Sequence, residues 1–272
     1  MKTDYAAAAA KISEAGALII TAGAGMGVDS GLPDFRGNQG FWNAYPMYAR
    51  LGLSFVDAAN PQHFERDPLF GWGFYGHRTN LYRETEPHAG FSILRDWISR
   101  YNLGHFVVTS NVDGQFQKAG FNSNSILEVH GSIHHLQCLS PCCHDIWQND
   151  AEFSIDLESM RAMRAPGCPF CGGVARPNIL MFGDFSWLSD RTAVQEERFA
   201  SFMAGYKDKN IVVIELGAGS AVPTIRYLTE NLGSRSGIDV IRINPREPQI
   251  GNGHFSFNLG ALAALELIDG CL

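Results

Sequence analysis

The amino-acid sequence predicts an α/β protein: a Rossmann-like, doubly wound parallel sheet with a small inserted domain. Short apolar runs rich in β-branched residues alternate with helical segments along most of the chain, which is typical of parallel strands buried on both faces. A glycine-rich turn follows the first apolar run, and two clusters of cysteines interrupt the alternation after its midpoint. The alternation therefore predicts one sheet domain, and the cysteine clusters mark the insertion.

The composition is that of an ordinary folded protein. The 272 residues are 45% hydrophobic, 18% charged and 11% aromatic, which excludes disordered and collagen-like chains and allows one large domain with a small insertion. Acidic residues outnumber basic ones by 28 to 21, for a formal charge of -7. No overall positive field would attract phosphate backbones, so nucleic acid is not an expected partner.

The N-terminal segment and the cysteines indicate the cellular compartment of the protein. Glu14 interrupts the N-terminal segment before an apolar signal core could form, and the apolar stretch 15–22 is too short to span a bilayer, so no membrane partner is expected. Five of the six cysteines are clustered, which favours a metal site over disulfides and hence a reducing compartment. We predict a cytoplasmic protein.

The expected elements follow from the periodicity. A main nucleotide-binding domain is predicted over 1–132 and 177–272, with a small module over 133–176 and a loop-and-helix excursion over 40–87. The aromatic residues of that excursion are expected to form the core of a lid more than an acyl tunnel. Strands of the main sheet are predicted at 17–21, 105–109, 126–129, 178–182, 211–216 and 239–243, and helices at 90–101, 224–232 and 259–268.

The first predicted strand runs into a turn suited to phosphate. Gly23, Gly25 and Gly27 lack a Cβ, so backbone N–H groups around Ala24 and Gly25 can approach a pyrophosphate at a helix N-terminus. The triplet Asp34-Phe35-Arg36 then supplies an acid, an aromatic ring and a cation for gripping a dinucleotide. The alternative is a turn stabilised by Pro33 and an exposed Asp–Arg pair.

Polar residues follow two more predicted strands. Ser110, Asn111 and Asp113 come after the strand at 105–109, and His130 follows the strand at 126–129. Because the carboxyl ends of parallel strands meet at one edge of a sheet, we expect Asn111, Asp113 and His130 to converge there as the catalytic group. Ser110, Asn111 and Asp113 are expected to contact the cofactor. A hydrogen-bonded structural role is the alternative for a single histidine.

A second strand-then-glycine pattern occurs late in the chain. Gly217, Gly219 and Ser220 are predicted to contact phosphate or ribose, and Asn244 to lie near an adenosine. Their alternatives are a helix-entry turn and a plain Asn-Pro turn.

The clustered cysteines predict zinc. Cys138 and Cys142, or Cys143 in its place, pair with Cys168 and Cys171, and the second pair is followed by two glycines as in a metal knuckle. Pro141 favours Cys142 over Cys143. Four thiolates leave no open position for water, so the predicted zinc-binding domain serves folding rather than chemistry. A redox dithiol is the alternative.

In order, these motifs resemble the sirtuin family over nearly the whole chain; they are Gly23-Ala-Gly-Met, Ser30-Gly-Leu-Pro-Asp-Phe-Arg36, Thr109-Ser-Asn-Val-Asp113, Val129-His-Gly-Ser132, the cysteine pairs, Met181-Phe-Gly-Asp184 and the turn 217–220. The resemblance implies an NAD-dependent protein-lysine deacylase that releases nicotinamide and O-acyl-ADP-ribose, with NAD bound between the two domains and an acyl-lysine protein or peptide as partner. It implies that Asn111 and Asp113 orient the nicotinamide and its ribose, and that His130 is the general base on a ribose hydroxyl.

The chain also departs from the family pattern. Ser110 stands where sirtuins usually have Gln, Gly27 where many have Ser, and residues 182–187 read Phe-Gly-Asp-Phe-Ser-Trp where a Phe-Gly-Glu followed by Pro is usual. Because that last segment pairs with the peptide backbone in the family, ADP-ribosyl transfer and NAD hydrolysis stay open as alternative activities. A non-catalytic NAD or ADP-ribose sensor is less expected, since it should lack the base. The oligomeric state is not predicted.

Overall fold

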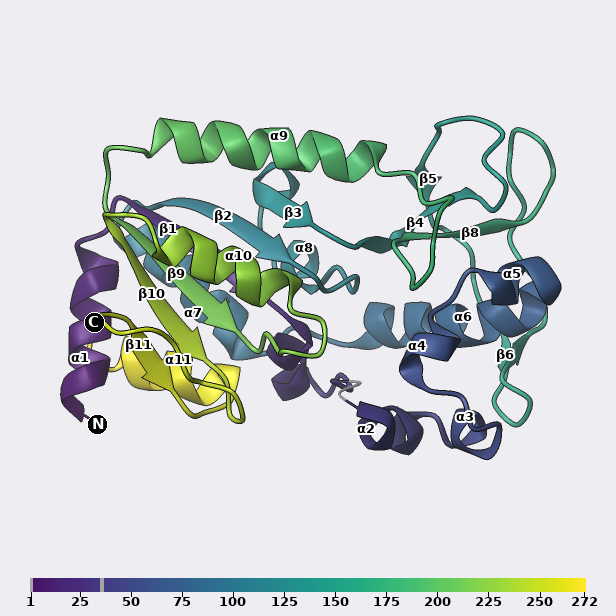
Figure 1. The fold of residues 1–272 in the computed structure, drawn as a ribbon, viewed down its shortest axis with the longest axis horizontal. Coiled ribbons are helices and arrows are strands. Elements are labelled where there is room, and N and C mark those ends of the chain that lie inside the picture. The colour runs from purple at the N-terminus through teal and green to yellow at the C-terminus, as the bar shows by residue number, and fades with distance from the viewer. Residues whose placement is uncertain (1, 35–36) are drawn as a thin grey trace.

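The computed structural model describes residues 2–34 and 37–272, and its centre is a six-stranded parallel sheet. The strand order β11-β10-β9-β1-β2-β3 is that of a doubly wound fold, because the chain starts in the middle and builds outward in both directions (Figure 1). The bounds are β1 (Ala17–Ala22), β2 (Gly104–Thr109), β3 (Ile126–Glu128), β9 (Ile211–Leu216), β10 (Ile238–Ile243) and β11 (Phe255–Phe257). Five of the six predicted strands are confirmed, and β11 was not predicted.

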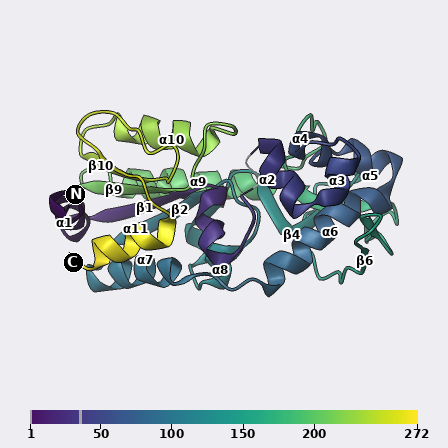
Figure 2. The same cartoon turned by 90° about the horizontal axis from the view of Figure 1, so that it is seen from below.

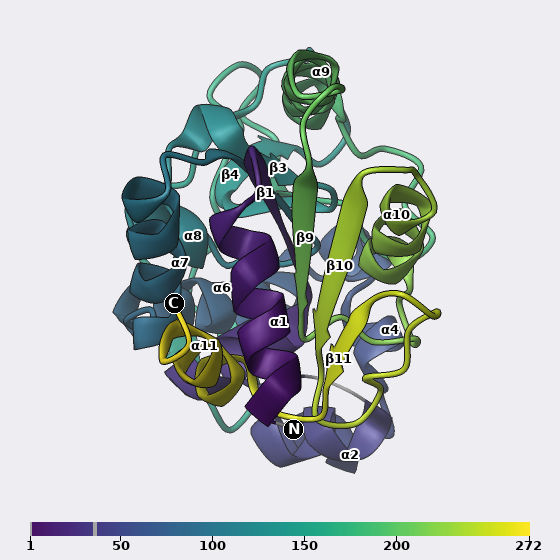
Figure 3. The same ribbon diagram turned by 90° about the vertical axis from the view of Figure 1, so that its left-hand side faces the viewer.

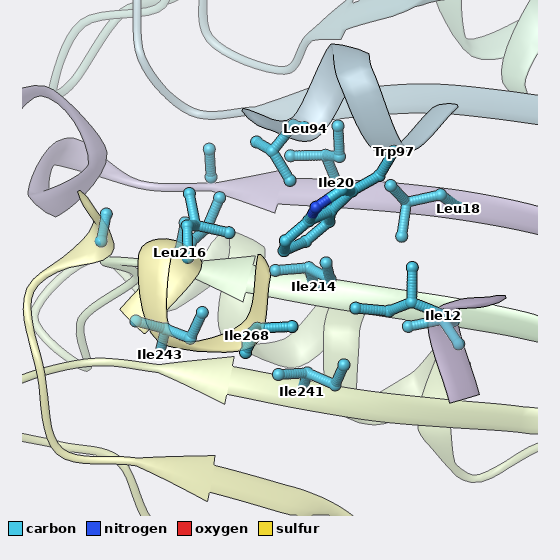
Figure 4. Close-up of a cluster of buried hydrophobic side chains, with 14 of the residues drawn as sticks. Ile12, Leu18, Ile20, Leu94, Trp97, Ile214, Leu216, Ile241, Ile243 and Ile268 are labelled. Carbon is cyan, nitrogen blue, oxygen red and sulfur yellow. The ribbon is translucent and has the colours of Figure 1, made fainter. Parts of the chain in front are cut away.

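Helices cover both faces of this sheet. On one face lie α1 (Lys2–Ser13), α7 (Ala89–Arg100) and α11 (Ala261–Asp269); on the other lie α9 (Asp190–Gly205) and α10 (Thr224–Gly233) (Figure 3). Trp97 of α7 and Ile268 of α11 are fully buried against Ile20 and Ile214 of the central strands (Figure 4). The sheet is therefore buried on both faces, as its continuous apolar runs predict.

A second unit lies beyond the carboxyl ends of the parallel strands. Its three-stranded antiparallel sheet has the order β5-β4-β8, with β4 (Gly131–Cys138), β5 (Trp147–Gln148) and β8 (Ala175–Ile179). The hairpin of β6 (Ile155–Asp156) and β7 (Arg161–Ala162) lies nearby. The prediction of a strand over 178–182 in the parallel sheet is wrong. Since β4 leaves the main sheet directly after His130, residues 175–179 find their backbone partner on β4. The division of the chain at 132 and 177 stays a prediction.

Five helices between β1 and α7 pack on this second unit, as Figure 2 shows. They are α2 (Gly37–Ala44), α3 (Pro46–Arg50), α4 (Phe55–Ala58), α5 (Gln62–Arg66) and α6 (Pro68–Glu84). Phe41, Trp72 and Phe74 are almost completely buried in one cluster with Ile133 and Ala175 of the small sheet. The expectation that the aromatics of 40–87 build a core is confirmed for these rings.

Short helical segments complete the chain: η1 (Ala24–Ser30), α8 (Gln115–Lys118) and η2 (Ser123–Ser125). Both termini lie at the end of the main sheet that faces away from the second unit (Figure 1). Within the described residues, no helix combines the length and the apolar character needed to cross a membrane.

Candidate active site

A cleft of about 860 Å³ lies between the carboxyl ends of the parallel strands and the second unit. Loops after β1, β2, β3 and β9 line one side, and α4, α6 and residues 179–185 line the other. Nine of the residues predicted for the site line this cleft together: Gly23 of the phosphate turn, Ala24, Asp34, Ser110, Asn111, Asp113, His130, Gly219 and Ser220. The polar ends of separate strands therefore converge, as the sheet topology requires.

Asn111 and Asp113 are held in place by the loop that follows β2. The hydroxyl of Thr109 accepts the Asn111 N–H at 3.0 Å, and the Asn111 side-chain amide donates to the carbonyl of Gly23 at 3.1 Å. Asp113 is 8% exposed, and its carboxylate accepts the Gln115 N–H at 2.9 Å. Burial raises the pKa of Asp113 to about 6, because the charged form loses its water. A carboxyl group that titrates near neutrality faces the cleft.

His130 lies in the link between β3 and β4. Its Nε2 is 3.4 Å from the Oγ1 of Thr224 at the start of α10. Burial lowers the pKa of His130 below its usual value, and a hydrogen bond with the backbone of Ser110 acts in the opposite direction. The imidazole is therefore neutral at pH 7, the state in which a histidine accepts a proton.

The two glycine-rich turns touch one another. The Gly25 N–H donates to the carbonyl of Gly217 at 3.1 Å, and a Cβ on Gly217, where φ is +61°, would lie 2.4 Å from the Gly25 backbone. A Cβ on Gly23 would lie 2.8 Å from Ala218. Gly25 and Gly217 border a smaller hollow of about 60 Å³ instead of the main cleft. Close approach of the two turns explains these glycines, so a direct cofactor contact for Gly25 and Gly217 stays a prediction.

Ser220 and Asn244, the polar residues predicted in the C-terminal part of the chain, are hydrogen-bonded within the protein. The backbone N–H and hydroxyl of Ser220 donate to the Glu247 carboxylate at 2.9 and 2.6 Å. Asn244 is fully buried, and its side-chain amide donates to the Ala218 carbonyl at 2.7 Å. Its Oδ1 accepts the N–H groups of Arg246 and Glu247. Asn244 therefore shapes the loop behind the cleft and does not line it.

Of the predicted triplet, only Asp34 is described; Phe35 and Arg36 lie outside the described residues. Asp34 accepts a hydrogen bond from Arg246 at 2.8 Å, across 212 positions of sequence. Both residues line the cleft, so this ion pair joins the loops after β1 and β10 at its rim. Arg246 and Glu247 were missed at the sequence level, although their position just after a predicted strand was a usable signal.

The sequence analysis also missed Arg78 and Tyr82 of α6, and it expected Tyr75 of the same helix to form part of a lid core. All three line the cleft, and Arg78, 7% exposed, donates from Nε and Nη2 to the Tyr82 hydroxyl at 2.9 and 2.6 Å. The guanidinium lies 5.1 Å from the ring centroid of Phe74. An arginine within an aromatic helix was the only local signal, and it does not say which way the helix faces.

Residues 182–187 border the cleft from the second unit. Arg176 and Asp184 form a fully buried, bidentate ion pair, and the Asp184 carboxylate also accepts the N–H groups of Met181 and Ser186 at 3.3 and 3.1 Å. Phe185 is completely exposed at the rim. The ion pair thus fixes the loop that presents this ring.

Four cysteine sulfurs gather at the far end of the small sheet. The Sγ atoms of Cys138, Cys142, Cys168 and Cys171 all lie within 4.8 Å of one another, and the pairs Cys138–Cys171 and Cys142–Cys168 are 3.7 Å apart. A tetrahedral zinc ion with Zn–S bonds of about 2.3 Å sets its sulfurs about 3.8 Å apart. The donor set therefore fits zinc. Among the described residues, Cys143 is not part of this group.

Comparison with known proteins agrees with the fold. The family model described as the Sir2 family matches residues 23–214. A relative from Thermococcus kodakarensis named NAD-dependent protein deacylase is 31% identical over 237 residues, covering 87% of this chain and 83% of its own. One from Pyrococcus furiosus with the same name is 28% identical over 222 residues, covering 82% and 79%.

Solved structures share the fold. A Sir2 homologue in complex with NAD superposes with a TM-score of 0.70 at 23% identity, covering 97% of this chain and 93% of its own. Another Sir2 homologue, a mutant in complex with ADP-ribose, gives a TM-score of 0.70 at the same identity. With its strand order, its polar strand ends and the match over most of its length, the chain belongs to the Sir2 family, the sirtuins.

Proposed function

We propose that this protein is an NAD-dependent protein-lysine deacylase. The observation that carries the proposal is that Asn111, Asp113 and His130, from two different strand ends, line one cleft beside the turn at Gly23 and Ala24. The names of the relatives from Thermococcus kodakarensis and Pyrococcus furiosus support the same activity.

The cleft fits the cofactor. Its volume of about 860 Å³ lies within the range typical of small-molecule sites, and Gly23 and Ala24 of the glycine turn line it together with Ser110. NAD supplies the ADP-ribosyl group that takes up the acyl group, with nicotinamide as the leaving group. Ser220 can donate a hydrogen bond to NAD only by giving up one of its two bonds to Glu247.

The chain's own groups then hold and move protons. Ionised Asp113 and the Asn111 amide orient the nicotinamide end, at the bottom of the cleft between the two units. Neutral His130 accepts the proton of a ribose hydroxyl through its imidazole, which makes that oxygen the nucleophile toward the acyl carbon. The lowered pKa of His130 keeps the base unprotonated at pH 7.

The acceptor enters from the second unit. β8 is an edge strand of the small sheet, and residues 182–187 continue from it along the cleft, so an extended acyl-lysine peptide has backbone groups to pair with. A solved sirtuin complex is described with a deacetylated peptide and an acetylated ADP-ribose, and it superposes with a TM-score of 0.65 at 19% identity.

Zinc has a structural part in this proposal. Cys138, Cys142, Cys168 and Cys171 would hold the ion away from the cleft, where it ties residues 138–142 to 168–171. Ligands of this kind stay thiolates in a reducing compartment, which supports a cytoplasmic location.

Mass spectrometry of the products tests the activity. The purified protein is incubated with NAD, with and without an acetyl-lysine or succinyl-lysine peptide, and His130→Ala is the matched control. Peptide-dependent O-acyl-ADP-ribose supports the proposal. An ADP-ribosylated protein, or ADP-ribose formed equally without peptide, would replace it with transferase or hydrolase activity.

A further inference from the structure

The strand end that leads to His130 lacks a strand on its outer side. β3 is only three residues long and forms the edge of the sheet, paired with β2 alone. The backbone N–H of Glu128 instead donates to Oε1 of Gln195 at 3.0 Å, and its carbonyl accepts the Thr192 hydroxyl at 3.3 Å. The side chains of α9 thus replace the missing neighbouring strand.

An ion pair strengthens this contact. Nη2 of Arg191, in the first turn of α9, donates to Oε2 of Glu128. Glu128 is 1% exposed and Arg191 is 20% exposed, so the pair is shielded from water. Oε1 of Glu128 is buried and has no hydrogen-bond partner within the described part of the chain. A buried carboxylate held at one oxygen depends strongly on its single cation.

The end of β3 and the residues after it are also hydrogen-bonded to residues 109–113, the loop that carries Asn111 and Asp113. The Val129 N–H donates to Thr109, and the Ile133 N–H donates to Val112, at 2.9 and 3.0 Å. Nε2 of His134 lies 2.9 Å from the carbonyl oxygen of Asp113. Residues 109–113 and 129–134 therefore move together, and Glu128 is the point at which α9 holds them.

We propose that Arg191 is a positioning residue for the reaction: through Glu128 it holds the strand end that carries His130 and neutralises the carboxylate charge beside Asp113. This inference rests on the proposed function only in assuming that Asp113 and His130 act on NAD. It adds α9, which begins three residues after the acceptor-side segment 182–187, to the machinery of the site.

The charges around Asp113 determine the sign of the expected effects. Arg78 and Tyr82 face it from α6, Glu128 from β3 and His134 from β4. The Glu128 carboxylate raises the pKa of Asp113, whereas Arg78 lowers it. Loss of Arg191 leaves Glu128 uncompensated and raises that pKa further; loss of the Glu128 charge lowers it.

The experiment measures nicotinamide release from NAD against pH for Arg191→Gln, Glu128→Gln and the double variant. Arg198→Gln, an exposed arginine on the same helix, is the matched control. We expect Arg191→Gln to move the acid limb of kcat/KM upward by about half a pH unit or more, and Glu128→Gln to move it downward. The acid limb of the double variant should lie close to that of Glu128→Gln, because the carboxylate charge that Arg191 compensates is then absent. Arg191→Lys should recover most of the wild-type limb.

Two checks separate this inference from folding and from the proposed function. The pH dependence of the NAD dissociation constant reports the same pKa without turnover, and Glu128→Gln decides the matter if Arg191→Gln does not fold. If both acid limbs coincide with that of Arg198→Gln, the positioning role is overturned. Nicotinamide release is common to deacylation, transfer and hydrolysis, so the identity of the acyl product tests the proposed function separately.

Discussion

The Nε2 atom of His130 lies 3.4 Å from the Oγ1 of Thr224, so the proposed base lies between the end of β3 and the start of α10. At this distance the hydroxyl orients the ring weakly and leaves the imidazole able to accept a proton. Five predictions follow from this site and its surroundings.

His130→Ala should lower peptide deacylation by about 10²-fold or more, the scale of a general-base contribution, while NAD still binds. Thr224→Ala is the matched control and should retain most turnover, because its contact is long. Steady-state kinetics and calorimetric NAD binding measure the two effects. Near-full turnover by His130→Ala would remove this residue from the mechanism.

Asp113→Asn should stabilise the protein and inactivate it. The pKa of Asp113 is raised from 3.8 to about 6, so the folded state binds this proton more tightly than the unfolded state does. The group's contribution to the free energy of unfolding therefore falls as pH rises from about 4 to about 6, and at pH 7 it costs about 3 kcal/mol. Chemical denaturation at pH 7 should show that Asp113→Asn has a free energy of unfolding higher than that of the wild type by this amount. At pH 4 the difference should be much smaller.

The same raised pKa predicts the acid limb of the wild-type enzyme. If ionised Asp113 is needed, kcat/KM for NAD should fall as pH drops through about 6, and protonation of His130 in acid also removes the base. A flat profile between pH 5 and 7 would contradict the assignment.

Cys171→Ala should lose zinc and lower the melting temperature, and activity should fall only together with structure. Cys143→Ser is the matched control, since Cys143 is outside the group of four sulfurs, and it should keep one equivalent of zinc. Elemental analysis and thermal melts measure both variants. Zinc-free, fully folded wild-type protein would reject the site.

Phe185→Ala should weaken turnover of acyl-lysine peptides and leave nicotinamide release without peptide unchanged. The ring is completely exposed at the cleft rim, so its loss costs the fold little, whereas covering it with a peptide buries apolar surface. We expect KM for peptide to rise about fivefold, the effect of about 1 kcal/mol. Phe170→Ala, another exposed ring in the small module, should change neither reaction; equal effects of the two variants would contradict an acceptor role for Phe185.

Local patterns were sufficient to predict the elements that depend on neighbours in the chain. The apolar runs at 17–21 and 211–216 were correctly predicted as buried strands. Both faces of a parallel sheet are covered, so consecutive residues of such a strand are mostly apolar, and this pattern is visible in the sequence. The convergence of Asn111, Asp113 and His130 was likewise predictable, since parallel strands deliver their carboxyl ends to one edge. The cysteine spacing also predicted the group of four sulfurs, because each half of the group comes from two cysteines close together in the chain.

The remaining features depend on which distant segments meet, and no local pattern encodes that. The segment 178–182 was predicted as a strand of the parallel sheet, but the path of β4 determines that a strand forms over residues 175–179 and pairs with β4, outside that sheet. Asn244 follows a strand as a ligand would, yet its side chain is hydrogen-bonded to Ala218 in the loop after β9 and to Arg246 and Glu247 in the loop after β10. Arg191 reaches Glu128 across 63 positions, and Arg246 reaches Asp34 across 212. The Arg191–Glu128 pair forms because burial of the Glu128 charge requires a partner, and in both pairs it is the tertiary structure that brings the two distant segments together.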